Sequence, residues 1–182
     1  MKKIILIVGL PGSGKSLASE IIKRKFKAEK FSSGDIIREE IKRRGWKYTP
    51  ENDRKIADWF HTGDREKLLV KRTWSKIKNS RRKYIVIDGL RSVEGYVYLK
   101  NIAESKPIII SILAPFNVRV KREIARGRFG KTGIASYLRN RDKSEGKIGV
   151  NKLMRKADFR IYNPNISKKQ FEKRVLDIVK KI

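Results

Sequence analysis

The sequence predicts an α/β fold in which a mostly parallel, five-stranded sheet is covered by helices on both faces. Short apolar runs rich in β-branched residues alternate with longer stretches of helical periodicity. This alternation is typical of parallel strands joined by right-handed crossovers. A glycine-rich turn follows the first run, and further polar residues follow later ones. Parallel strands would therefore gather these polar residues at one edge of the sheet.

The first predicted strand, at about residues 2–8, leads into a glycine-rich turn and then into helix-forming residues from 17 to 25. A phosphate-binding loop requires this order, because the glycines let N–H groups point inward toward an anion at the helix start. Lys15 would reach the β- and γ-phosphates of a nucleoside triphosphate, and Ser16 would be a ligand of Mg²⁺. The alternative is a surface turn that matches the pattern by chance. The predicted nucleotide-binding residues are Gly9, Leu10, Pro11, Gly12, Ser13, Gly14, Lys15 and Ser16.

A helical insertion is predicted at residues 34–80, after a second strand at about 28–32. The turn at residues 33–35 can cap a helix that runs from about 36 to 44, where Gly45 stops it. Thr49 and Pro50 would start a second helix to about residue 61, and a third would cover 66–78. The large aromatic side chains are expected in the core rather than on a ligand platform. They are Trp46, Trp59, Phe60 and Trp74.

The third predicted strand, at about residues 83–88, ends in Asp88. A carboxylate at the carboxyl end of a buried parallel strand lies at the edge where ligands bind, so Asp88 is placed to orient Mg²⁺ opposite Ser16. The alternative is that Asp88 caps the helix beginning near Val93.

The fourth strand, at about residues 107–113, precedes a basic helix that is opened by Pro115 and runs to about Gly127. Residues 127–149 are rich in Gly, Arg and Lys and poor in apolar side chains. Such a segment is expected to be mobile and could close over a polyphosphate, although a solvated loop with a short helix fits equally well. A fifth strand at about 157–162 and an amphipathic helix at 167–182 complete the chain.

The composition limits which partners and which metal sites the protein can have. The net charge is +28, from 47 Lys and Arg against 19 Asp and Glu, and the cations are spread over all segments. Such a charge attracts nucleic acid or another polyanion, but a high charged fraction is also typical of thermophilic proteins. With Cys at 0 and a single His61, thiolate zinc sites are excluded and His-based metal sites are disfavoured. No run is long enough to span a membrane, which predicts a soluble, cytoplasmic protein.

On these motifs the chain resembles the nucleoside monophosphate kinases, and within them the archaeal adenylate-kinase-related proteins, with dephospho-coenzyme A kinases more distant. The resemblance spans essentially the whole chain. It rests on the phosphate loop, on residues 33–38 (SGDIIR), on residues 88–91 (DGLR) and on Arg122 and Arg126. It implies one P-loop NTPase-type three-layer domain over residues 1–182, with an acceptor-binding insertion at 34–80 and a short lid at 127–149.

The resemblance also implies roles for single residues. The acceptor would be a small phosphate-bearing molecule such as AMP, bound by Ser33, Asp35, Arg38 and Arg91. The donor would be ATP with Mg²⁺, and the metal ligands would be Ser16 and Asp88. The residues implied in catalysis are Lys15, Arg91, Arg122, Arg126, Arg139 and Arg141, the last two as candidates for a lid arginine.

The chain also departs from the adenylate kinase pattern. Gly95 stands where those enzymes have a Gln that reads the AMP base, and Leu90 stands where they have a Pro. These departures leave ATP binding in place and remove the basis for AMP specificity. Two alternatives to a kinase therefore stay open: an ATPase acting on or with RNA or a ribonucleoprotein, and an ATP-dependent regulatory switch.

Overall fold

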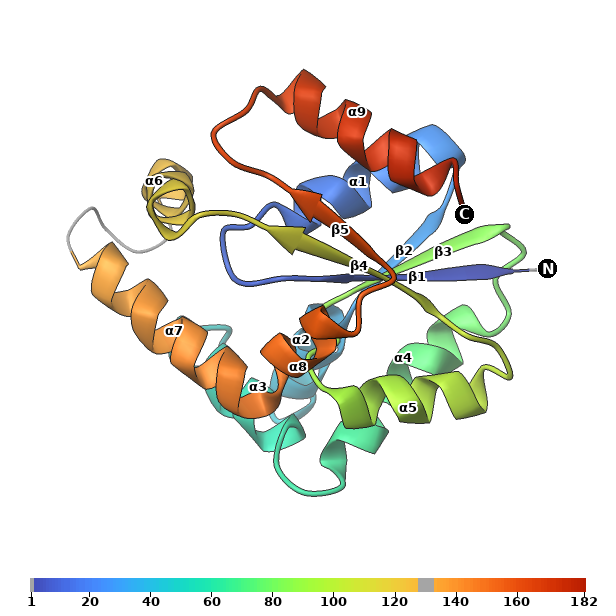
Figure 1. Ribbon diagram of the computed structural model, residues 1–182. Helices are drawn as coiled ribbons and strands as arrows, with labels where there is room; N and C mark the ends of the chain where they lie inside the picture. Colours follow the sequence, from blue (N-terminus) through green and yellow to red (C-terminus); the bar gives the residue numbers. More distant parts are fainter. Residues whose placement is uncertain (1, 128–132) are drawn as a thin grey trace.

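The computed structural model describes residues 2–127 and 133–182, and its centre is a parallel five-stranded sheet (Figure 1). The strand order is β2-β3-β1-β4-β5, with every neighbouring pair parallel. The predicted fold class and all five predicted strands are confirmed. The strands are β1 (Lys3–Val8), β2 (Glu29–Ser32), β3 (Tyr84–Asp88), β4 (Ile108–Leu113) and β5 (Phe159–Tyr162).

Helices cover both faces of the sheet (Figure 1). On one face lie α1 (Lys15–Phe26) and α9 (Lys168–Val179), and on the other lie α4 (Arg65–Ile77), α5 (Val93–Ile102) and α8 (Val150–Arg155). Successive side chains of a strand point to opposite faces. Along β1, Ile5 and Ile7 accordingly pack with α1 and α9, whereas Ile4 and Leu6 pack with α4, α5 and α8. The central strands are buried from both sides, which fixes the register that positions the loops at their carboxyl ends.

The insertion after β2 has a small apolar core of its own, shared by α2 (Ser33–Arg43), α3 (Pro50–Phe60) and α4. Thr49 caps α3 as predicted, since its hydroxyl accepts a hydrogen bond from the Asn52 N–H at 3.1 Å. The predicted start of α2 is wrong. Ser32 is its cap, accepting from the Gly34 N–H at 3.2 Å, so residues 33–35 form the first helical turn rather than the turn before it.

Of the four aromatic residues expected in the core, Trp46 is the exception. Phe60 is fully buried, and Trp59 and Trp74 are partly buried against apolar clusters. Trp46 is 41% exposed, so the expectation is wrong at this position. It follows Gly45, whose φ of +70° ends α2 and turns the chain away from the buried stripe of that helix.

The segment at 127–149 is better anchored than its composition suggests. After α6 (Phe116–Arg126) and Gly127, residues 128–132 of the predicted lid lie outside the described residues. From Ile134 the chain forms α7 (Ile134–Ile148), a helix of 15 residues with Ile134 3% and Leu138 0% exposed. The prediction of too little apolar surface is therefore wrong for this part, because two well-spaced residues suffice to hold one helical face.

Helix α8 was also not predicted. It begins directly after Gly149, and its Leu153 is fully buried against the sheet. In the described part of the chain, no helix has both the length and the apolar character needed to cross a membrane.

Candidate functional site

The phosphate loop, residues 9–16, joins β1 to α1 at the carboxyl edge of the sheet (Figure 1). Gly12 and Gly14 of this loop have backbone conformations that L side chains rarely adopt, with φ +76° and φ +109°. Both are also enclosed. A Cβ at Gly12 would lie 3.0 Å from the Cβ of Arg119, and one at Gly14 would lie 2.5 Å from Nδ2 of Asn163. Glycine is therefore required at both positions by conformation and by space.

Two side chains from distant parts of the chain hold the carbonyl side of this loop. Arg122 of α6 donates from Nη1 to the carbonyl oxygens of Gly12 at 3.4 Å and Ser13 at 3.3 Å. Asn163, which follows β5, donates from Nδ2 to the same Ser13 oxygen at 2.8 Å. The two also meet each other, with Arg122 Nη2 3.1 Å from Asn163 Oδ1. Because the N–H and C=O of a trans peptide point apart, holding the carbonyls leaves N–H groups free to face an anion.

A second brace comes from Arg119, which is only 4% exposed. Its Nη1 donates to the carbonyl of Pro11 at 3.1 Å, and its guanidinium pairs with both oxygens of Asp142 at 2.9 and 2.7 Å. This bidentate ion pair ties the loop through α6 to α7. The loop is thus held by three side chains, from α6 and from the residue after β5, in the ligand-free protein.

The loop contains a group suited to an anion. The hydroxyl of Ser13 is buried and has no hydrogen-bond partner within the described residues. An unpaired buried hydroxyl is costly, and a phosphate oxygen would satisfy it. The residues present therefore fit a bound polyphosphate.

Lys15 lies at the start of α1, and its Nζ donates to the carbonyl of Leu10 at 3.2 Å. Burial lowers the pKa of the Lys15 ammonium from its usual value, while the carboxylates of Asp88 and Glu145 counteract that shift. Arg91 and Arg126 add to the lowering through like-charge repulsion. An anion that binds next to such a desolvated cation stabilises its charged form.

Ser16 and Asp88 approach each other at the predicted metal position. The Ser16 hydroxyl lies 3.5 Å from Oδ2 of Asp88, which ends β3 and is 7% exposed. Two oxygen ligands at adjacent corners of a Mg²⁺ octahedron are about 3 Å apart, so the pair fits such an ion. The alternative that Asp88 caps α5 is wrong, because Ser92 caps that helix by accepting from the Gly95 N–H at 2.9 Å.

Protein groups alone would not complete this metal site. Within the described residues, no group of three or more His, Cys, Asp or Glu side chains could hold a metal ion. Further ligands would have to be phosphate oxygens and water, as Mg²⁺ usually has in nucleotide sites.

Two of the predicted catalytic arginines converge on one carboxylate. Arg91, after β3, lies with Nε 3.4 Å from Oε2 of Glu145, and Arg141 of α7 lies with Nε 3.3 Å from Oε1. The Glu145 side chain is 7% exposed and the two arginine side chains are 21% and 23% exposed. This cluster is close enough to Lys15 for Glu145 to raise and Arg91 to lower the pKa of its ammonium.

The remaining predicted arginines have partners other than Glu145. Arg139 stacks over the ring of Phe116 at 5.3 Å, Arg126 pairs with Glu123, and Arg38 pairs with Asp35. Arg122 uses its guanidinium on the carbonyl side of the loop, so its contact with a donor nucleotide stays a prediction. Residues two positions apart on a helix point to nearly opposite sides. For this reason α7 directs Arg141 and not Arg139 toward Glu145.

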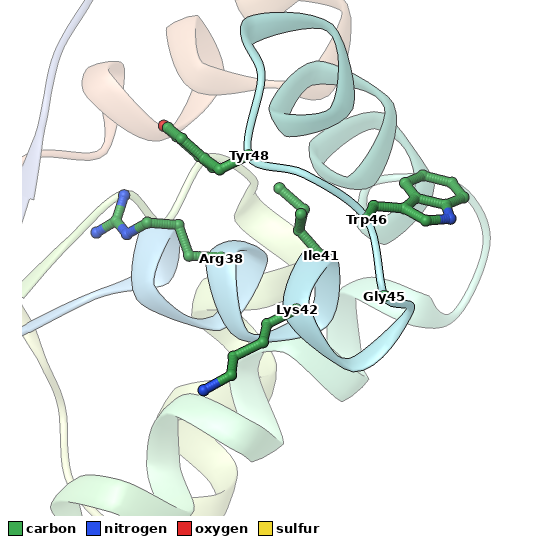
Figure 2. A pocket seen from close by; sticks show the side chains of 6 residues that line it. All are labelled: Arg38, Ile41, Lys42, Gly45, Trp46 and Tyr48. Carbon is green, nitrogen blue, oxygen red and sulfur yellow. The ribbon is translucent and has the colours of Figure 1, made fainter.

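A pocket of about 450 Å³ opens beside α2 and the chain that follows it (Figure 2). Figure 2 shows that Arg38 and Tyr48 extend to the same side, whereas the ring of Trp46 points away from them. Tyr48 is 61% exposed. The pocket therefore joins the arginine predicted for an acceptor phosphate with an exposed aromatic ring. Its lining residues are Arg38, Ile41, Lys42, Gly45, Trp46 and Tyr48.

Sequence reasoning missed the acidic and amide partners of this site. Asn163, Asp142 and Glu145 gave no local signal, because each acts on a residue of another element. A helical reading of 134–148 would have placed Ile134, Leu138 and Glu145 on one face, at intervals of four and seven residues. A buried carboxylate on that face would then have required a cationic partner.

Comparisons with known proteins agree with this architecture. A family model described as an AAA domain matches residues 8–136. A UPF0200 protein of Hyperthermus butylicus is 33% identical over 169 residues, which is 93% of this chain and 89% of that protein. A UPF0200 protein of Thermococcus onnurineus is 33% identical over 183 residues, covering 98% of this chain and 97% of the relative.

Solved structures share the fold at low sequence identity. Shikimate kinase from Acinetobacter baumannii in complex with shikimate superposes with a TM-score of 0.64 at 15% identity, over 100% of this chain and 94% of that chain. Shikimate kinase from Aquifex aeolicus superposes with a TM-score of 0.58 at 19% identity, over 98% and 96%. At these identities the likeness concerns the fold, which is a P-loop kinase-like α/β fold.

Proposed function

Since this chain belongs to the AAA-domain family and to the UPF0200 proteins, we propose that it is an ATP-dependent phosphotransferase. It would move the γ-phosphoryl group to a small phosphate-bearing acceptor, such as a nucleoside monophosphate. The observation that carries the proposal is the grouping of cations at the loop. Arg91 and Arg141 meet at Glu145 near Lys15, and so place two guanidinium groups, beyond the loop lysine, where a second phosphate could bind.

Phosphoryl transfer needs in-line positioning and neutralisation of the charge that spreads over the transferred group. The loop N–H groups and Lys15 would bind the donor phosphates, and Arg91 with Arg141 would hold the acceptor phosphate and the transferred group. Arginine suits this task because its planar fork grips phosphate with two hydrogen bonds. Ser16 and Asp88 would hold Mg²⁺, which supplies neutralisation of phosphate charge when bound.

The pocket at α2 supports an acceptor that carries a planar group. Arg38 would bind its phosphate, and Tyr48 and Ile41 would provide an apolar surface next to it. At Gly95, in contrast, a side chain would crowd its neighbours. A Cβ there would lie 2.8 Å from Oε1 of Glu66 and 3.0 Å from Cδ1 of Leu90. Recognition of the acceptor would therefore differ from that of adenylate kinases.

The test is transfer of label from γ-labelled ATP, with Mg²⁺, to a panel of acceptors. The panel contains AMP, CMP, UMP, GMP, dephospho-coenzyme A, shikimate and a short RNA. We expect label in one nucleoside monophosphate. Lys15→Ala should abolish transfer and weaken ATP binding by about tenfold to a hundredfold, the effect of losing one charged hydrogen bond.

The matched control is Lys23→Ala, which removes an exposed lysine from the same helix and should leave transfer unchanged. Label released only as inorganic phosphate, with no acceptor labelled, would contradict the phosphotransferase. Label in shikimate alone would show an acceptor that bears a carboxylate instead of a phosphate, and would overturn the acceptor class.

A further inference from the structure

Three stretches of chain meet at the amino-terminal edge of the sheet, at the opposite end from the phosphate loop. They are residues 2–3 before and in β1, 78–83 between α4 and β3, and 180–182 after α9. The Lys2 ammonium donates to the Lys78 carbonyl at 2.8 Å, and the Lys3 N–H donates to the Lys83 carbonyl at 2.8 Å. The Lys3 ammonium donates to the Ile182 carbonyl. In Figure 1 both chain termini lie at this end.

These stretches carry a dense group of cations, which we term the amino-edge face. No Asp or Glu occurs in the three stretches. All the cations of the face are exposed, and none forms an ion pair with an acidic side chain in residues 2–127 or 133–182. The face consists of Lys2, Lys78, Arg81, Arg82, Lys83, Lys180 and Lys181.

Several other groups of cations, in contrast, are paired with carboxylates. Near the phosphate loop, Arg119 pairs with Asp142, and Arg91 and Arg141 share Glu145. In the insertion, Glu40 pairs with Arg43, Arg44 and Arg72. At the amino-edge face the nearby carboxylates are few: Glu29 accepts from the Ser80 hydroxyl, and Asp177 precedes Lys180 by one helical turn. Neither pairs with a cation of the face in the described residues, so like charges repel there in a chain whose net charge is already +28. A polyanion that bound there would relieve this repulsion and release its own counterions.

The spacing of the cations suits a phosphate backbone. Lys3 is one residue out of register with Lys83, since Lys3 pairs with Tyr84 on the adjacent strand. Adjacent strands are about 4.8 Å apart, and each strand of duplex nucleic acid carries one phosphate per about 3.4 Å of helix axis, so both spacings lie within the reach of a lysine or arginine side chain. Several cations of the face can therefore contact successive phosphates at the same time.

We infer that the amino-edge face binds the phosphodiester backbone of double-helical nucleic acid. Membrane surfaces are disfavoured, because they are bound by cations combined with exposed apolar side chains. None of the exposed large apolar residues of the described chain belongs to the three stretches. Single strands are disfavoured as well, because they need exposed aromatic rings for stacking. Tyr84, the aromatic residue at this edge, packs edge-on against Phe26 at 5.5 Å and is only partly exposed.

Backbone binding of this kind reads no sequence and depends steeply on salt. It is also independent of the phosphotransferase, because the face and the phosphate loop lie at opposite ends of the sheet. DNA and RNA duplexes share the relevant chemistry, so both belong in the test.

The experiment compares the full chain with the triple variant Arg81→Gln, Arg82→Gln, Lys83→Gln. Binding to duplexes of about 20 base pairs, of DNA and of RNA, is measured by fluorescence anisotropy between about 50 and 200 mM salt. The matched control is Lys168→Gln, Lys169→Gln, Lys173→Gln, which removes equal charge from exposed positions on α9. ATP affinity, measured in parallel, reports whether each variant is folded.

We expect the face variant to bind duplex about tenfold or more weakly at about 100 mM salt, with the slope of log affinity against log salt reduced by about 3. The α9 variant should stay within about twofold of the native chain, and ATP affinity should be unchanged in both. The inference is overturned by three results: no duplex binding at low salt, an equal loss in both variants, or tighter binding to single strands or to anionic vesicles than to duplex.

Discussion

The guanidinium of Arg91 and the carboxylate of Glu145 form an ion pair beside the phosphate loop, with Nε 3.4 Å from Oε2. Glu145 is buried, and its other oxygen faces Arg141. The carboxylate thus pairs with the same two arginines that a substrate phosphate would bind. Glu145 therefore neutralises the arginines in the ligand-free protein, and a phosphate would compete with it for them.

From this arrangement we predict that Glu145→Gln makes the protein depend on anions. The variant should lose about 1–2 kcal/mol of stability, because two partly buried arginines lose their counter-charge. Inorganic phosphate or ATP should then raise the melting temperature of the variant more than that of the native chain, since the anion replaces the missing carboxylate. Thermal unfolding with and without phosphate measures both effects.

Glu40→Gln is the control for this prediction. Glu40 is also a buried carboxylate with arginine partners, but it joins α2 to α4 and is fully enclosed. Its loss should destabilise the protein with no extra gain from phosphate. Equal phosphate responses in the two variants would show that the arginines around Glu145 do not form a phosphate site.

The lowered pKa of Lys15 predicts a pH dependence. Its folded-state pKa lies below the ordinary lysine value of 10.5, mainly because of burial. In alkaline solution below 10.5 the unfolded chain therefore binds more protons at this site than the folded chain, so the stability of the ligand-free protein gains from Lys15 as pH rises. ATP binding requires the charged ammonium, so ATP affinity should fall over the same range.

Calorimetric titration of ATP from pH 7 upward measures this fall, and Lys15→Arg is the comparison. Arginine keeps its charge throughout, so the variant should lose less affinity with pH, even if it binds less tightly at neutrality. If both proteins lost affinity in parallel, the titration would belong to another group.

Gly14 and Asn163 offer a test of how the loop is braced. Gly14→Ala should destabilise the protein strongly, because φ is +109° and the new Cβ would lie 2.5 Å from Nδ2 of Asn163. In an Asn163→Ala background the steric part disappears and the conformational part, about 1–2 kcal/mol, remains. Chemical denaturation of the four proteins in this cycle should therefore give a coupling energy of about 1 kcal/mol or more. Additive effects would contradict the contact.

The parts of this fold that could be predicted are those set by local pattern. The strand at residues 84–88 shows no alternation of apolar and polar residues, and its residues before Asp88 are apolar or aromatic. Such a run suffices to predict a strand, because both faces of a parallel sheet are covered. The phosphate loop was predictable because glycines, strand and helix are consecutive in the chain. Asp88 could be placed because the end of a strand fixes its position at the sheet edge.

The rest depended on contacts between distant residues. Asn163 contacts the Ser13 carbonyl from 150 residues further along the chain, and Arg122 contacts it from 109 residues further along. No local pattern in the sequence predicts contacts over such separations. Trp46 was misjudged because burial depends on the turn at Gly45 rather than on hydrophobicity. Residues 134–148 were misjudged because composition conceals a narrow apolar stripe, and a single helical face held by Leu138 outweighs the polar remainder.

The distance of 3.5 Å between the Ser16 hydroxyl and Asp88 gives the last prediction. If both are ligands of Mg²⁺, directly or through water, then Ser16→Ala and Asp88→Asn should each reduce the gain in ATP affinity that Mg²⁺ provides, and their combination should cost less than the sum. ATP binding without Mg²⁺ should change little in Ser16→Ala. It should strengthen in Asp88→Asn, because a carboxylate that repels phosphate has been removed.

Ser111→Ala, which alters a buried serine on β4 with no hydrogen-bond partner among the described residues, is the control and should leave the Mg²⁺ gain intact. Titrations of ATP with and without Mg²⁺ decide the matter: an undiminished Mg²⁺ gain in both site variants would mean that the metal is held by other groups.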